Sequence, residues 1–345
     1  DVGVELRDAQ EDGSMTRWAT VEAQFREAAE AWEAAGVDCV WINAGEESNE
    51  IGTLFKRLAR RSYACDLRPE FCRRAIAPDD MAAAKAAGRR CLYMTANGVP
   101  LPQRFESLED ELSFIRPLFQ LGVRMAHLVY QRGNAIGQGC GEPNDGGLTD
   151  FGRAVVAEMN RVGMIVDVAH AGLKTSLDAA RCSAKPMVAS HTVCHALNPH
   201  FRAKTDEVMK AIAATGGYVG ICAIGSFLGG ACDLNAFLDH VQYALKLLGP
   251  DHVAIGTDVA YAIRTPDAGA ARAAWPRHRR PWRLLWPAGP AVTPGPNAEL
   301  SLAWTNVPMI TVGLVQRGVA DADIAKIMGG NCLRVAKALW DSREP

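Results

Sequence analysis

Short apolar segments alternate with longer amphipathic segments along nearly the whole chain. Each apolar segment is four to six residues long, which is typical of strands buried on both faces of a sheet. In the longer segments, which are rich in Ala, Glu, Arg and Leu, apolar residues recur at helical spacing. The predicted strands are Val2–Leu6, Val37–Ile42, Arg90–Met94, Met125–Tyr130, Met164–Val168, Pro186–Ala189, Tyr218–Cys222 and His252–Ile255. The predicted helices are Val21–Ala35, Asp79–Ala87, Leu108–Leu121, Thr149–Val162, Lys174–Ala180, Asp206–Ala214 and Leu234–Leu248.

This alternation predicts an α/β fold in which helices connect parallel strands. Eight such units are the number that closes a (β/α)8 TIM-type barrel, so we expect residues 1–345 to form a single barrel domain. A doubly wound open sheet is the alternative. Its nucleotide-binding form is disfavoured, because no GxGxxG follows the first predicted strand and no GxxxxGK[ST] occurs in the sequence.

Two segments after the eighth predicted strand depart from the pattern. Residues 262–297 are rich in Pro, Arg and Trp and show neither helical nor strand spacing, which predicts a long loop. In a barrel this loop lies on the catalytic face, where it would cover the pocket, contact another subunit or remain a mobile basic loop. Residues 309–340 are amphipathic and are expected to close the barrel as C-terminal helices.

Composition and charge narrow the class of protein. With 37 Lys and Arg against 39 Asp and Glu, the formal charge is −2, which excludes a general electrostatic binder of nucleic acid. No window approaches eighteen uninterrupted apolar residues, so no transmembrane segment is predicted. We expect a soluble protein of the cytoplasm or the periplasm, since a removed leader would leave the same sequence. The ten cysteines include no CxxC pair and are expected to be reduced.

Polar side chains follow several of the predicted strands, at the ends where a barrel carries its chemistry. Histidines end the fifth and sixth strands, and carboxylates follow the first and eighth. Imidazole and carboxylate are the ligands that suit zinc and its neighbours, and such a metal lowers the pKa of bound water. The strand-end residues are Asp8, Gln10, Asp12, Thr95, Asn97, Tyr130, Arg132, His170, His191 and Asp258.

Four segments of the chain resemble the membrane (renal) dipeptidases and their bacterial relatives, metallo-dipeptidases with an amidohydrolase-like barrel. The sequence DGGLTDFGRAVVAEMNRVGMIVDVAHAG (Asp145–Gly172) is similar to the family pattern GLTxFGxxVVxEMNRLGMxxDxSH. Ser190–Ile221, His252–Asp258 and Met309–Val335 continue the resemblance, which covers most of the chain from about residue 80. The resemblance implies a hydrolase of dipeptides that uses zinc, and it also implies a homodimer.

The family holds two zinc ions with an HxD on strand 1, a bridging Glu after strand 3, a His after each of strands 5 and 6, and an Asp after strand 8. By resemblance, His170 and His191 match the two histidines, and Asp258 matches the Asp that helps activate water. Arg202, in HFRAKTDE, matches the arginine that binds the substrate carboxylate. Tyr130 falls where many members have a substrate-contacting His.

Two positions depart from the family pattern. The sequence DAQED resembles DGHND, which places Gln10 where the family has its metal-binding His and keeps Asp12. MTANGVPL resembles xIENGxPL, which places Ala96 where the family has its bridging Glu, although Thr95 or Asn97 could instead face the pocket. An alanine methyl cannot offset the repulsion between two neighbouring dications, so one zinc ion is expected rather than two. The predicted metal residues are His170, His191, Asp258 and Asp12, with Gln10 and Ala96 at degenerate ligand positions.

The sequence thus predicts a metal-dependent hydrolase of dipeptides or similar small amides, with catalytic Asp258, His170 and His191 and with Arg202 and Tyr130 binding the substrate. Two alternatives stay open because of Gln10 and Ala96. A metal-free pocket could transfer protons in a tautomerase-like or isomerase-like reaction on a peptide-derived intermediate. The same fold could also serve as a binding or assembly protein without catalysis.

Overall fold

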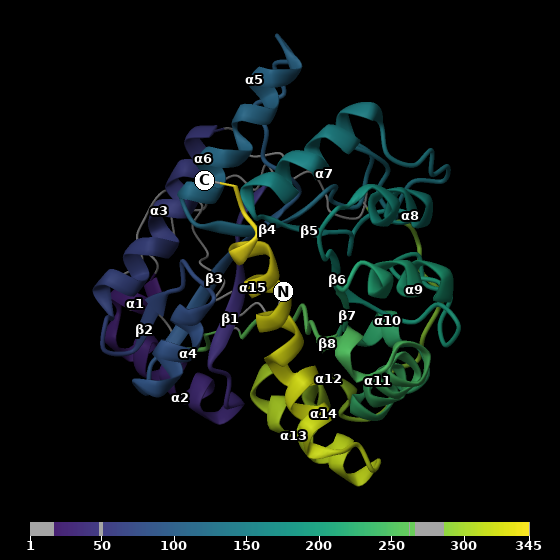
Figure 1. Ribbon diagram of the computed structural model, residues 1–345. Coiled ribbons are helices and arrows are strands. Elements are labelled where there is room, and N and C mark those ends of the chain that lie inside the picture. Colours follow the sequence, from purple (N-terminus) through teal and green to yellow (C-terminus); the bar gives the residue numbers. More distant parts are fainter. Residues whose placement is uncertain (1–16, 48–50, 262, 266–285, 345) are drawn as a thin grey trace.

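The computed structural model describes residues 17–47, 51–261, 263–265 and 286–344 (Figure 1). Its sheet is entirely parallel, in the order β1-β3-β4-β5-β6-β7-β8, and β2 pairs with β3 beside this path. The predicted strand at Val2–Leu6 lies outside the described residues. The strands are β1 (Cys39–Glu46), β2 (Cys72–Arg74), β3 (Arg90–Asn97), β4 (Val123–His127), β5 (Ile165–Asp167), β6 (Val188–Thr192), β7 (Tyr218–Ile221) and β8 (Val253–Ile255).

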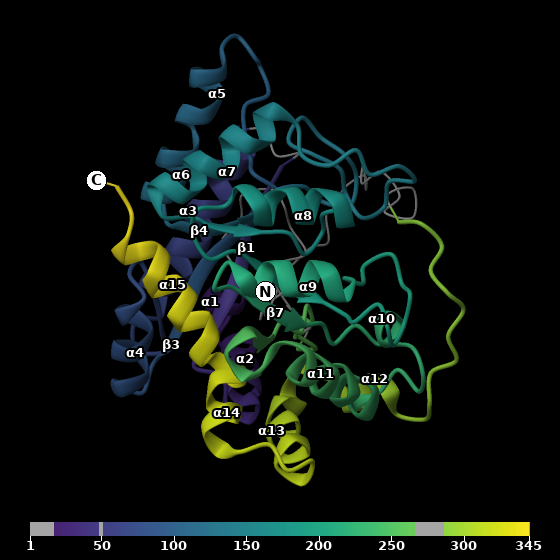
Figure 2. The same ribbon diagram turned by 45° about the vertical axis from the view of Figure 1, so that its right-hand side comes forward.

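Helices cover the outer face of the curled sheet, as Figures 1 and 2 show from two directions. The helices that precede β8 are α1 (Arg17–Thr20), α2 (Glu22–Ala35), α3 (Ile51–Leu67), α4 (Asp79–Ala86), α5 (Leu108–Ser113), α6 (Ile115–Gln120), α7 (Asp150–Val162), α8 (Leu173–Cys182), α9 (Asp206–Ala214), α10 (Gly225–Leu228) and α11 (Leu234–Leu248). After β8 follow α12 (Ala298–Ser301), α13 (Val307–Gln316), α14 (Asp321–Ala325) and α15 (Asn331–Asp341).

The ends of the longer helices are set by side chains that satisfy free backbone groups. The Thr149 side chain accepts a hydrogen bond from the Gly152 N–H and so begins α7, and Asp233 does the same for α11 through the Ala236 N–H. Gly163 ends α7 with φ of 88°, a left-handed conformation that favours glycine.

The apolar core has two shells because successive side chains of a strand point to opposite faces. The outer shell lies between the sheet and the helices and includes Leu92, Met94 and Ala96 of β3. The inner shell includes a layer with one residue from each of seven strands, inside the barrel as in TIM-type barrels. These residues are Trp41, Tyr93, Met125, Ile165, Val188, Tyr218 and Ala254.

Helix α15 closes the amino-terminal end of the barrel. Ile165, Val188 and Tyr218 are the first residues of their strands, so the inner layer lies at that end. Val335 and Leu339 of α15 pack into the same layer, and Figure 1 shows α15 crossing the centre of the sheet. The opposite end, where the strands finish, is therefore the one left for a site.

Much of the predicted loop at residues 262–297 lies outside the described residues, including Trp275, Trp282, Arg277, Arg279 and Arg280. From residue 286 the chain runs without regular structure past α10 to α12 (Figure 2). Trp286 packs at its start, with its ring centroid 5.8 Å from that of Phe201 and 5.8 Å from that of Phe227.

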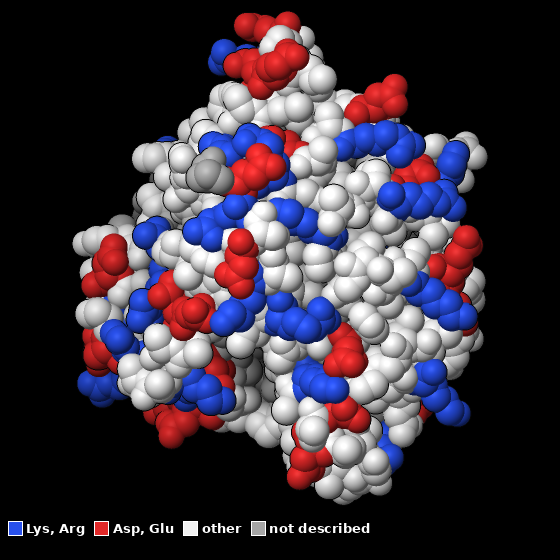
Figure 3. Space-filling model, in the orientation of Figure 1, with Lys and Arg blue, Asp and Glu red and all other residues white. Residues whose placement is uncertain are grey.

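The predictions from composition concern membrane-spanning segments, the cysteines and the distribution of charge. None of the helices in the described part of the chain is both long and apolar enough to cross a bilayer. All ten cysteines are free thiols. On the face shown in Figure 3, basic and acidic residues are interspersed rather than gathered into one field.

The closure of the barrel by α15 gives a prediction about stability. Leu339 is 0% exposed, so Leu339→Ala should lower the free energy of unfolding by about 2–5 kcal/mol, as large-to-small core changes do. Leu300 on α12 is 62% exposed, and Leu300→Ala is the matched control, expected to change it by less than about 0.5 kcal/mol. Urea unfolding measures both values, and equal losses would contradict this role of α15.

Candidate functional site

A polar layer lies above the apolar inner layer, toward the carboxyl ends of the strands. Its members follow the inner-layer residues of β1, β3, β4, β5 and β6 by two positions and therefore point into the barrel. All of them are buried. They are Asn43, Thr95, His127, Asp167 and Ser190.

The Asp167 carboxylate lies at the centre of this layer. Its Oδ1 accepts hydrogen bonds from the backbone N–H groups of Ala169 (2.9 Å) and Ser190 (3.0 Å). Its Oδ2 lies 2.7 Å from Nε2 of His127. Burial alone would raise the pKa of Asp167, but the attraction of His127 and the hydrogen bonds outweigh burial and hold it well below the usual range. The carboxylate is therefore ionised at neutral pH.

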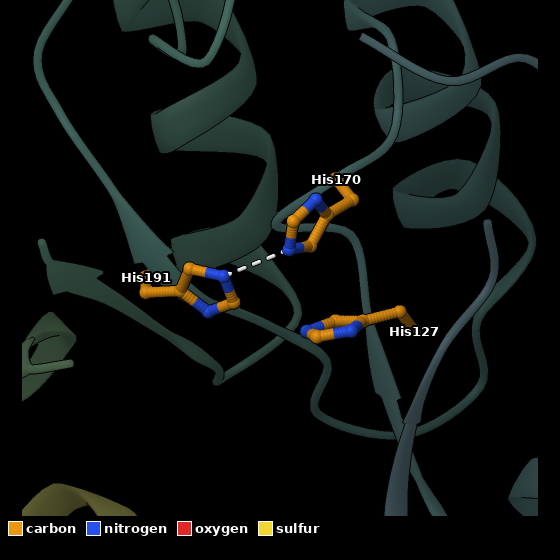
Figure 4. Close-up of side chains that lie close together, drawn as sticks. All are labelled: His127, His170 and His191. Atoms are coloured by element: carbon orange, nitrogen blue, oxygen red, sulfur yellow. Dashed lines mark hydrogen bonds between the residues drawn. The ribbon is translucent and has the colours of Figure 1, made fainter. Parts of the chain in front are cut away.

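His127, His170 and His191, which we call the histidine cluster, converge from β4, from the segment after β5 and from β6 (Figure 4). One nitrogen from each ring lies within 4.8 Å of the others. Burial, reinforced by the nearby Arg202 charge, lowers the pKa of His170 and of His191 well below 6.5. Both imidazoles are therefore neutral and have a lone pair for a proton or a metal ion.

Gln131 fixes the tautomer of His170. The Gln131 Oε1 atom accepts a hydrogen bond from Nδ1 of His170 at 2.6 Å, so Nδ1 carries the proton and Nε2 has the lone pair. Gln131 is buried, and its φ of 64° is a left-handed conformation uncommon for a residue with a side chain.

His191 faces His170 across a short gap, with 3.0 Å between their Nε2 atoms. In the absence of a cation, Nε2 of His191 must donate to His170, and its Nδ1 then accepts from the Ser190 hydroxyl at 2.8 Å. With a cation, both Nε2 lone pairs can face it. Two nitrogens bound to one tetrahedral zinc at about 2.0–2.1 Å lie about 3.3 Å apart, so the observed spacing fits a shared ion.

The other predicted residues lie around this pair. Asp258 follows β8 with φ of 55°, and its Oδ2 lies 3.9 Å from Nε2 of His191. The Tyr130 ring lies against His170, with 4.4 Å between the ring centroids. The structure thus brings four predicted residues together, whereas Asp12 and Gln10 lie outside the described residues.

Arg202 and Lys204 are two buried cations close to the cluster. Arg202 donates to the backbone carbonyls of Ala169 and His191, and its Nε has no hydrogen-bond partner among the described residues. Lys204 donates to the carbonyl of Ala171 and to the Ser176 hydroxyl, and burial lowers its pKa to about 8. Within the described ranges, neither forms an ion pair with a carboxylate, so together they create a positive potential.

A pocket of about 350 Å³ lies beside these residues. Ala171 and Gly172, which directly follow His170, line one part of it, and Cys140, His200 and Phe201 line others. Because His200 and Phe201 stack at 4.2 Å between ring centroids, an aromatic surface adjoins the polar end of the barrel.

Ala96 lies in the outer shell, packed with Met94 rather than with the polar layer. Thr95 takes the corresponding place on the inner face, opposite Asn43 of β1. The Asn97 side-chain oxygen is buried without a partner in the described part of the chain. The structure therefore gives no carboxylate at the end of β3.

Two residues of this region were not singled out by the sequence. His127 lies inside the fourth predicted strand, which runs to Tyr130, whereas β4 ends at His127. Glu47 was missed because the predicted strand ended at Ile42, and β1 continues to Glu46. The Glu47 Oε2 atom accepts hydrogen bonds from the Tyr130 N–H (3.2 Å) and from the Asn134 side chain (2.7 Å).

Glu47 has an unusual protonation equilibrium. Burial raises its pKa to about 7, although the two hydrogen bonds and the proximity of His127 act in the opposite direction. Gly98 packs against this side chain, since a Cβ there would lie 2.5 Å from Cβ of Glu47. Glu47 therefore holds the segment that carries Tyr130 and Gln131. It lies near the end of β3, where Ala96 stands in place of the family's Glu.

A sequence model of the membrane dipeptidase family (peptidase family M19) matches residues 4–268. The dipeptidase aclJ of Aspergillus oryzae is 30% identical over 229 residues, which cover 65% of this chain and 47% of that protein. The dipeptidase tcpJ of Claviceps purpurea is 26% identical over 268 residues, covering 76% of this chain and 54% of that protein. The chain thus spans about half the length of the curated relatives it matches.

Solved structures agree with the fold. An amidohydrolase from Pseudomonas aeruginosa has a TM-score of 0.74 and 26% identity, covering 92% of this chain and 93% of that chain. A metallo peptidase from Rhodobacter sphaeroides, solved with a phosphinate mimic of the dipeptide L-Ala-D-Ala, has a TM-score of 0.72 and 18% identity, covering 94% and 96%. The predicted (β/α)8 barrel of the amidohydrolase type is confirmed.

The raised pKa of Glu47 predicts how stability depends on pH. Between the unfolded pKa of about 4.5 and the folded value of about 7, the native state keeps a proton that the unfolded chain releases. The contribution of protonated Glu47 to the free energy of unfolding therefore falls as pH rises through that window, by up to about 3 kcal/mol.

Urea unfolding of the chelator-treated protein from pH 4.5 to 8.5 measures this effect. The difference between wild type and Glu47→Gln should grow in favour of the variant as pH rises. Glu46→Gln is the matched control, because it removes the neighbouring carboxylate, which forms an ion pair with Arg57 at 3.1 Å. Parallel curves for wild type and Glu47→Gln would refute the buried-acid assignment.

Proposed function

Since the chain belongs to the membrane dipeptidase family, we propose that it hydrolyses the amide bond of a dipeptide or a similar small amide, with one divalent metal ion in the histidine cluster. The observation that carries this proposal is the facing pair of neutral imidazoles, His170 and His191, whose Nε2 atoms lie 3.0 Å apart. Asp258 adds a carboxylate 3.9 Å from one of these nitrogens. Two imidazoles and a carboxylate form a ligand set that suits zinc.

When bound, the ion would polarise the scissile carbonyl and lower the pKa of water. The protein supplies the proton transfers. Asp258 follows β8 and is half-buried, and we assign its Oδ2 the role of accepting the proton of the attacking water and passing it to the leaving amine. His170 is held in one tautomer by Gln131 and cannot turn away from the reacting groups.

The positive potential of Arg202 and Lys204 supports a substrate that carries a carboxylate. Their buried charges lack an acidic partner among the described residues, which is costly unless a ligand provides one. We propose that Arg202 attracts the terminal carboxylate of a dipeptide. Tyr130, lying against His170, would form the wall beside the scissile bond.

A proton-transfer reaction without metal is the second candidate. It is favoured by one observation, the chain of hydrogen bonds that runs from Ser190 through His191 and His170 to Gln131. Such a chain can move a proton between two positions of a bound, peptide-derived ligand. The homodimer that the family resemblance implies stays a prediction.

Metal titration combined with a turnover assay tests the hydrolase proposal. Protein stripped with chelator should regain dipeptide hydrolysis as it takes up about one zinc ion per chain, because one facing imidazole pair provides one site. His170→Ala should lower turnover at least about a hundredfold, since even indirect supports of a metal ligand contribute 10–100-fold.

His252→Ala is the control, because His252 contacts the Gly217 carbonyl outside the cluster and should leave turnover unchanged. Absence of hydrolysis at saturating zinc across a panel of dipeptides would overturn the proposal. If a proton-exchange assay on the same panel then showed activity that chelator leaves intact, the metal-free candidate would replace it.

A further inference from the structure

The third imidazole of the cluster, His127, has no place in the ligand set proposed so far. It ends β4, is 1% exposed, and its ring centroid lies 4.8 Å from that of His170 and 5.2 Å from that of His191. The family resemblance supplies one histidine after each of strands 5 and 6. His127 is therefore an additional imidazole in a site that lacks other expected ligands.

The hydrogen bonds of His127 leave one nitrogen unused. Nε2 lies 2.7 Å from Oδ2 of the ionised Asp167 carboxylate. Nδ1 is buried with no hydrogen-bond partner in the described part of the chain. A buried polar nitrogen without a partner is unfavourable, and native proteins rarely retain one without a function.

We propose that His127 is the third imidazole ligand of the metal ion, so that histidines from β4, from the segment after β5 and from β6 hold one cation. This inference rests on the proposed metal site and adds to it a residue that compensates for Gln10 and Ala96. Three histidines with one open position form a known arrangement for a catalytic zinc. One nitrogen from each of the three rings lies within 4.8 Å of the others, so the rings can close around one ion with small side-chain movements.

The Asp167 carboxylate contacts His127 and belongs to the same arrangement. Ligating histidines usually donate their second ring N–H to a carboxylate or a carbonyl, which orients the ring and increases its basicity. Gln131 accepts such a hydrogen bond from Nδ1 of His170, and Oδ2 of Asp167 lies 2.7 Å from Nε2 of His127. Asp167 also adds a negative charge near the cation, which offsets part of the repulsion from Arg202 and Lys204.

The same geometry assigns a change at His191 when the ion binds. Its Nε2 must give up the proton it shares with His170, so the proton moves to Nδ1 and the Ser190 hydroxyl becomes the acceptor. The net change is one rearranged proton within a neutral imidazole. His170 keeps the tautomer it already has, because Gln131 holds its second nitrogen.

Metal binding to the full chain tests the proposal without reference to activity. Chelator-stripped wild type, His127→Gln and the control His252→Gln are titrated with Zn²⁺ against a chromophoric chelator. We expect wild type and the control to bind about one ion alike and His127→Gln to bind at least about tenfold more weakly, the lower end of what indirect metal supports contribute. Equal affinities for wild type and His127→Gln would overturn the inference and leave the hydrolase proposal intact.

Weaker binding by His127→Gln could also result from misfolding of the variant. A spectroscopic measurement on the wild-type protein avoids this ambiguity. Long-range ¹H–¹⁵N spectra of the histidine side chains should show three rings shifting on addition of Zn²⁺, one each for His127, His170 and His191. A shift of two rings alone would refute the role of His127. Three shifted rings in a protein that hydrolyses no dipeptide would support this inference and reject the proposed function, and no binding at all would reject both.

Discussion

The buried carboxylate of Asp167 is the interaction on which the polar end of the barrel depends. It is 0% exposed and accepts hydrogen bonds from the N–H groups of Ala169 and Ser190, which directly precede His170 and His191. It also holds His127 through Oδ2. One ionised side chain therefore sets the position of all three imidazoles, and the surrounding hydrogen bonds provide the compensation that a buried charge requires.

The architecture was largely predictable because strands buried on both faces appear as continuous apolar runs. The ends of the strands were less predictable. Ala44 and Gly45 have weak strand preference, so the run in β1 seemed to stop before Glu47. Leu128 and Val129 are apolar but lie beyond β4, which made His127 look like a residue inside a strand. The three-residue β2 was too short to be recognised.

The site residues that could be predicted from the sequence are those that stand at the ends of strands. His170, His191 and Asp258 were identifiable because each stands at a strand end, where TIM-type barrels place their chemistry. The sequence could not show which face of β3 Ala96 occupies, because residues 91–96 are all buried and no alternation of polar and apolar residues marks the two faces. Nor could the role of Gln131 be foreseen, because it depends on a left-handed backbone conformation that brings its amide to His170.

The position of α15 has a consequence for the order in which the molecule is made. Its apolar side chains fill the floor of the barrel, yet residues 331–341 leave the ribosome after every strand of the described sheet. At synthesis rates of about 5–20 residues per second, the nascent barrel spends several seconds between completion of β8 and arrival of its floor. During that interval Tyr218 and Ile165 face solvent at the amino-terminal end of the barrel, which α15 has not yet closed. The nascent chain is therefore a client for chaperones until translation is nearly complete.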